Sequence, residues 1–206
     1  PGGHLTVRIS RTMPAKRLGR ITGGGIFAES QQLGLEDQWQ EQGVFGCDSV
    51  QTAVHRGQLH WGWGDTVLPQ RQLGLFHMIG ATTKIRPLDA WVPPIRLRYD
   101  YVVDAENQVR SIAQMPGDGP TWLSGYASLP DSEGTPRLVA TYDKIRAPLK
   151  PYEAGLCVWN ESTRHFQQHA ILWKLTNNDP EPPLRPRGHM NLWTDSEGRR
   201  WALFGD

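Results

Sequence analysis

Two aspartates near the first strand-like stretch are spaced so that they could act together as an acid and a base. Asp48 follows Cys47, and Asp65 stands 17 residues later in Gly64-Asp65-Thr66. Hydrolysis of a glycosidic bond uses two carboxyl groups, one that protonates the leaving oxygen and one that activates water or attacks the sugar. A hairpin between the two aspartates would bring both to the same end of two antiparallel strands. The pair therefore predicts a hydrolytic site at one rim of a sheet.

A repeat in the sequence distinguishes the two aspartates, because it contains only one of them. The nine residues from Gly57 to Asp65 are echoed by Gly198 to Asp206, and both stretches begin with Gly, contain aromatic residues and end in Gly-Asp. A looser copy spans residues 134–143. Asp65 thus recurs, so capping of a turn remains its alternative role. Asp48 has no counterpart in the other copies, which favours a special role for it.

Six further side chains are candidates for binding a substrate at the same rim. Indole faces stack on sugar rings, while charged and imidazole groups can hold hydroxyls. A structural role is the alternative for each: a core position for a tryptophan, a solvated charge at a strand end for the glutamate, and a satisfied strand position for a histidine. The predicted substrate-binding residues are Trp63, His77, Trp122, Glu153, Arg187 and His189.

The elements that must position these residues are predicted to be strands in sets of four. Alternation of apolar and polar residues and the intervening turns favour strands at 50–54, 59–65, 75–84 and 95–103, then at 122–129, 137–142, 155–159 and 166–172, and finally at 189–194 and 200–204. The turns Asp131-Ser132-Glu133-Gly134 and Asp195-Ser196-Glu197-Gly198 are identical and lie 64 residues apart. A repeat with four antiparallel strands per unit is typical of a β-propeller blade.

We therefore expect an all-β fold, an incomplete propeller of about two and a half four-stranded blades over residues 48–206, preceded by an N-terminal arm over residues 1–47. Since so few blades cannot close a ring, the sequence is expected to be part of a longer propeller. A small β-sandwich is the competing architecture. Within the arm, residues 29–42 are predicted to form a short helix, and Gly23-Gly24-Gly25 a turn rather than a phosphate loop.

Composition restricts the classes of partner. The 22 basic and 21 acidic residues nearly cancel, which argues against nucleic acid, while nine tryptophans suit a carbohydrate partner. No apolar run is long enough for a membrane span. No metal-ligand spacing is present, so no cofactor is predicted, although an ion such as calcium in a central channel stays open. Cys47 and Cys157 could pair or remain free thiols.

The segments Cys47–Thr52 and Trp61–Thr66 resemble the five-bladed β-propeller glycosidases, in particular bacterial proteins of the endo-D-arabinanase (DUF4185-like) type. Residues 74–83 are also similar to secreted bacterial propellers. The resemblance implies a five-bladed propeller, a secreted or periplasmic location, and hydrolysis of a polysaccharide or oligosaccharide by Asp48 and Asp65 at the channel mouth. A non-catalytic propeller that binds carbohydrate or a protein is the alternative.

Overall fold

The computed structural model describes residues 6–10, 12, 15, 18, 22, 33, 44, 46–68, 77–92, 95, 97–176 and 183–205. The turn predicted at 23–25, the helix predicted at 29–42 apart from Leu33, and the repeated Asp206 lie outside these residues. Within the described chain, no helix is both long and apolar enough to cross a membrane.

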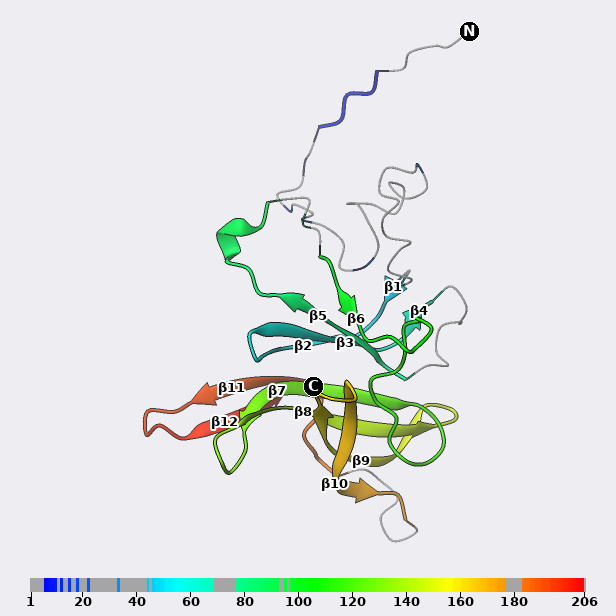
Figure 1. Cartoon of the computed structure of the whole chain (residues 1–206), viewed down its shortest axis with the longest axis vertical. Coiled ribbons are helices and arrows are strands. Elements are labelled where there is room, and N and C mark those ends of the chain that lie inside the picture. Colours follow the sequence, from blue (N-terminus) through cyan, green and yellow to red (C-terminus); the bar gives the residue numbers. More distant parts are fainter. Residues whose placement is uncertain are drawn as a thin grey trace.

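The described residues form an all-β structure of antiparallel sheets, none of them closed (Figure 1). Sheet one has the order β2-β3-β5-β6, and sheet two has the order β10-β9-β8-β7. Two hairpin-like pairs, β1 with β4 and β11 with β12, complete the structure. The strands are β1 (Gly46–Cys47), β2 (Val50–His55), β3 (Gln58–Trp63), β4 (Thr66–Val67), β5 (Ile79–Lys84), β6 (Asp100–Tyr101), β7 (Thr121–Pro130), β8 (Pro136–Arg146), β9 (Lys150–Asn160), β10 (His165–Lys174), β11 (His189–Thr194) and β12 (Arg200–Gly205).

The predicted grouping into two sets of four strands and a pair at 189–204 is confirmed, and the β1–β4 pair is an addition that was not predicted. The fourth strand is shorter than the predicted 95–103, because β6 is held only by the pairs Ala81↔Tyr101 and Thr82↔Asp100. The preceding loop carries a short 3-10 helix, η2 (Leu88–Ala90), instead of strand. Strands β8 and β9 run longer than predicted, since their pairing continues past Tyr142 to Arg146↔Lys150.

The first strands of successive sheets lie beside one another. Strand β2 packs against β7, and β7 packs against β11 (Figure 1). The main core fills the space between sheets one and two, where Leu123, Tyr126 and Leu138 from sheet two cluster with Met78 and Val102, which flank β5 and β6. A second apolar cluster, around Trp63, Ile79 and Tyr101, belongs to sheet one.

Three turns share one capping pattern, and each begins with an aspartate. One carboxylate oxygen of Asp131 accepts the amides of Glu133 and Thr135, and Asp195 does the same for the residues two and four positions later. Asp104 repeats the arrangement, which the sequence repeat did not reveal. At the fourth position of these turns φ is positive, so glycine fits there in two copies and asparagine in the third.

The close approach of sheet one to sheet two gives a first prediction. A Cβ added to Gly62 in β3 would meet the hydroxyl of Tyr126, whereas one added to Gly46 in β1 would meet nothing within 4 Å. We expect Gly62→Ala to lower the free energy of unfolding by about 1–3 kcal/mol through overpacking. The matched control Gly46→Ala should leave it nearly unchanged. Urea denaturation measures both, and equal effects would contradict this packing.

Candidate functional site

The segments that enter and leave the β2–β3 hairpin bring Asp48 next to Asp65. The pairs Cys47↔Thr66 and Val50↔Trp63 flank the two aspartates but belong to different sheets, and between them the backbone bends, with a positive φ at Ser49. The amide of Asp48 donates a hydrogen bond to the carbonyl of Asp65 at 2.8 Å. The hairpin therefore brings the two aspartates together, as their spacing predicted.

The side chains of both aspartates make few hydrogen bonds within the described part of the chain. Asp48 is exposed, and its carboxylate accepts only the Ser49 hydroxyl, at 3.2 Å. The half-buried carboxylate of Asp65 has no hydrogen-bond or ion-pair partner among the described residues. By contrast, Asp131 and Asp195 cap turns through their side chains. Asp65 thus does not play the turn-capping role that its repetition left open.

His77 lies at the same end of sheet one. It stands two residues before the first residue of β5, whose last pair with β3 is Trp63↔Ile79. Its Nδ1 accepts the amide of Thr121 at 3.0 Å, at the first residue of β7. Burial, and then the positive charges of Lys144 and His165, lower its pKa. The lowered pKa favours the neutral ring, which is the form that can accept the hydrogen bond from this amide. Through this bond His77 joins the end of sheet one near the aspartates to the start of sheet two.

Trp122 follows that contact point and is half-buried. It pairs with Asp143 of β8, whose Oδ1 accepts Nε and Nη2 of Arg185 at 3.1 and 2.7 Å. Sequence reasoning missed Arg185, although the resemblance of Asp143 to Asp65 was a signal that a partner for that carboxylate should be sought.

The loop before β7 is fixed by Lys144, a buried lysine whose ammonium donates to three carbonyls, those of Met115, Gly117 and Gly119.

Two predicted binding residues lie inside the protein. Trp63 is 1% exposed and stacks on Trp61 with ring centroids 5.7 Å apart, so its indole has the core role given above as the alternative. Glu153 is also buried and is not a solvated charge at a strand end. Its Oε1 accepts the Tyr142 hydroxyl and the Gln168 amide, and its Oε2 pairs with Lys174 at 3.2 Å.

The other two predicted residues, Arg187 and His189, are exposed next to the start of β11. Between them, Gly188 donates its amide to Ser124 Oγ at 3.3 Å. Ser124 also bonds Thr141 across the strand pair, whereas the neighbouring Leu123 belongs to the core shared with sheet one. Arg187 and His189 therefore lie on the face of sheet two that is turned away from Asp48 and Asp65.

A hydrogen-bonded cluster that sequence reasoning missed joins the two sheets at their opposite end. The buried ring of His55 contacts Ser128 Oγ at 2.7 Å and Glu161 Oε1 at 3.0 Å. Glu161 also accepts the Trp159 indole and pairs with Arg56. A serine, a histidine and a carboxylate in this order are the components of a hydrolase triad. Here the His55 side chain is 2% exposed and the Glu161 side chain is 45% exposed. A histidine this deeply buried favours a structural role, in which the cluster holds the two sheets together, over catalysis.

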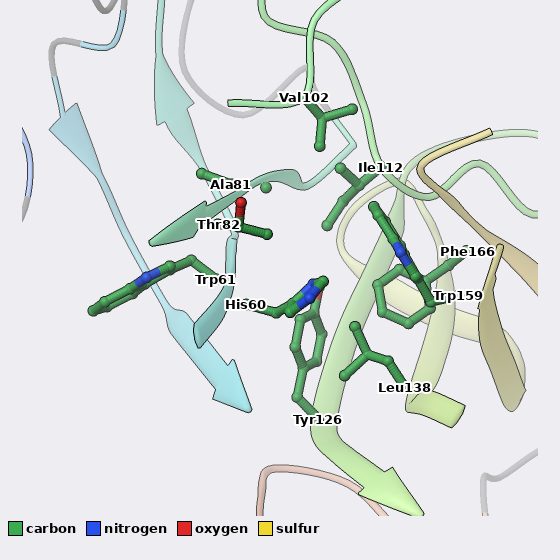
Figure 2. A pocket seen from close by; sticks show the side chains of 11 residues that line it. His60, Trp61, Ala81, Thr82, Val102, Ile112, Tyr126, Leu138, Trp159 and Phe166 are labelled. Atoms are coloured by element: carbon green, nitrogen blue, oxygen red, sulfur yellow. The ribbon is translucent and has the colours of Figure 1, made fainter. Parts of the chain in front are cut away.

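Two cavities lined by described residues near these sheets lie away from the aspartates. Figure 2 shows His60, Tyr126 and Leu138 converging between the sheets around a cavity of about 10 Å³, space for about one water molecule. A larger groove of about 480 Å³ lies over the other end of the hairpin, lined by residues that include Val54, Leu59, Leu88 and Trp91. Neither is lined by Asp48 or Asp65.

Both cysteines are free thiols. Burial raises the pKa of Cys47 to about 12 and also raises that of Cys157, which lies in the core between the sheets. Among the described residues, no group of three or more histidine, cysteine, aspartate and glutamate side chains is arranged to hold a metal ion.

His60 gives a prediction for the pH dependence of stability. Burial, followed by the charge of His55, lowers its pKa from 6.5 to about 4. Because the folded protein favours the neutral ring, the free energy of unfolding should be highest above about pH 6.5 and fall by roughly 2–3 kcal/mol as the pH approaches 4. We expect His60→Phe to flatten this part of the profile, measured by urea denaturation. The same substitution at exposed His189 is the control, and parallel profiles for wild type and His60→Phe would refute the assignment.

Comparison with known proteins adds no family assignment, because no protein-family model matches the chain and no curated protein matches its sequence.

Proposed function

We propose that the chain is a β-propeller glycoside hydrolase in which Asp48 and Asp65 cleave a polysaccharide or oligosaccharide. The observation that carries this proposal is the proximity of the two aspartates, since the Asp48 amide donates a hydrogen bond of 2.8 Å to the Asp65 carbonyl. Two carboxyl groups about 5–5.5 Å apart suit a retaining mechanism, and a separation of about 6.5–9.5 Å suits an inverting one. In either mechanism one aspartate protonates the leaving oxygen while the other attacks the sugar or activates water.

The arrangement of strands supports a propeller for this chain. In a propeller the first strands of the blades surround a common axis. Here β2 lies against β7 and β7 against β11. The contact between Ser124 and Gly188 joins residues 64 positions apart, the same period that separates the two matching turns. This contact thus joins two residues that are one repeat period apart in the sequence.

The resemblance to endo-D-arabinanase-type propellers suggests an arabinan-type substrate and a secreted or periplasmic protein. Such chemistry needs no cofactor, since both the proton and the nucleophile or base come from carboxyl groups.

The second candidate function is binding without catalysis. Trp193 and Trp201 form a directly opposed pair on the β11–β12 hairpin, and each is about half exposed. Tryptophan pairs on an accessible sheet face can bind the apolar face of a sugar or a protein partner. This surface would support binding whether or not the aspartates hydrolyse a substrate.

Substitution of each aspartate tests hydrolysis. We expect Asp48→Asn and Asp65→Asn each to reduce the release of reducing sugar from arabinan by about a hundredfold or more, because proton transfer by a positioned side chain contributes about that factor. Both variants should still bind the same polysaccharide, as measured by affinity electrophoresis. Asp89→Asn, at an exposed aspartate of η2, is the matched control.

Retained turnover in both variants would refute the assignment of the aspartates. Binding without any turnover in the wild-type protein would favour the second candidate function.

A further inference from the structure

We propose that the apolar groove on sheet one binds a small amphipathic anion, a carboxylic acid with a hydrocarbon tail. This groove has a volume of about 480 Å³, and neither Asp48 nor Asp65 lines it. Mainly apolar walls around a volume of roughly 300–1,000 Å³ are typical of sites for small organic ligands. The groove is therefore a site separate from the proposed hydrolytic one.

The floor of the groove is an apolar face of sheet one. Val54, Leu59 and Thr83 form one row across three strands, because Val54 pairs with Leu59 and Leu59 pairs with Thr83. Trp61 lies two residues along β3 from Leu59 and thus on the same face, and Figure 2 shows its ring pointing away from His60. Its indole nitrogen donates to Thr83 Oγ1 at 2.9 Å. This bond uses polar groups of both side chains, so the floor offers an apolar surface to a ligand.

The wall of the groove is the chain between β5 and β6, which leaves the sheet and returns to it (Figure 1). Leu88 of η2, Trp91 and Leu97 line the groove from this side. Leu88 is 91% exposed, and Ile85, which also lines the groove, is about half exposed. A hydrocarbon tail in the groove would remove this apolar surface from water, which favours binding.

Positive charges gather where the groove adjoins a second pocket, of about 290 Å³. Lys84 and Arg86 line both spaces, and Arg98 lines the second. The Arg86 guanidinium lies 5.4 Å from the centroid of the Trp91 ring. Lys84 and Arg98 are exposed and have no hydrogen-bond or ion-pair partner among the described residues. Both are therefore available to a ligand.

These charges select an anion. Asp100 also lines the second pocket, but its carboxylate pairs with Arg164 at 3.1 Å. Over the whole chain, 22 basic and 21 acidic residues nearly cancel, so the excess of positive charge is local to this place. Lysine and arginine bind carboxylates through charge-assisted hydrogen bonds. The carboxylate of the ligand would thus lie at Lys84 and Arg98, with its tail in the groove.

Calorimetric titration with fatty acids below their micelle concentrations tests this site. We expect decanoate to bind saturably. Its affinity should fall about three- to fourfold for each methylene removed, through octanoate to hexanoate, because each buried methylene contributes a similar free energy. Decyltrimethylammonium, with the same tail length and the opposite charge, should bind about tenfold more weakly at low salt. This difference should narrow as sodium chloride screens the charges.

Two substitutions at exposed positions separate the head group from the tail. Arg98→Gln should weaken decanoate binding about fivefold, through loss of a charge-assisted hydrogen bond, and should not weaken decyltrimethylammonium binding. Val54→Thr makes the floor more polar at nearly constant volume, and should weaken binding of both ligands about two- to threefold. Arg200→Gln, at an exposed arginine of β12, is the matched control and should change neither.

An affinity that does not depend on tail length would overturn the site, and so would equal binding of decanoate and decyltrimethylammonium at low salt. Decanoate binding that neither Arg98→Gln nor Val54→Thr alters would place the ligand elsewhere and refute the assignment. Absence of binding by all of these ligands would also refute it, and would leave the groove to a protein partner. Asp48→Asn protein should bind decanoate as the wild type does, so this test and the test of hydrolysis can fail independently.

Discussion

The close packing of sheet two on sheet one is the constraint on which the rest of the structure depends. Strand β3 has a glycine, Gly62, where the Tyr126 ring of β7 approaches, and any side chain there would occupy the position of the tyrosine hydroxyl. This contact, together with the apolar core around Leu123 and Met78, holds the beginning of β7 beside His77. The relative position of the aspartate pair and Trp122 is therefore a consequence of how tightly two sheets can approach.

Polar groups hold each end of this sheet interface. At one end His55 bonds both Ser128 and Glu161, and at the other end His77 accepts the Thr121 amide. A buried imidazole without partners would be costly, so these contacts also specify how the sheets are aligned. The buried ammonium of Lys144 has a similar local role, since three carbonyls of the 115–119 loop converge on it. Burial lowers its pKa, and those carbonyls replace the water that the ammonium loses.

Much of the fold could be predicted from the sequence, because alternation and turn residues are local signals. The strands of sheet two and the turn at Asp131 follow directly from such signals, and so does the pairing of Asp48 with Asp65 across a hairpin. The burial of Trp63 and Glu153 could not be predicted, because it depends on what covers each sheet face. The same is true of the His55, Ser128 and Glu161 cluster, whose members are 73 and 106 residues apart. Arg185 was missed for the same reason, since only the fold brings it to Asp143.

The β11–β12 hairpin differs from both four-stranded sheets because, among the described residues, no third strand pairs with it, so that both of its strands are edges. Its outer main-chain donors and acceptors are a template on which a strand from another molecule could add. The large apolar residues Leu192, Trp193, Trp201 and Leu203, each about half exposed, would strengthen such an addition. Concentrated solutions of this polypeptide are therefore expected to self-associate through this edge, and a charged residue introduced on β12 should improve its solubility.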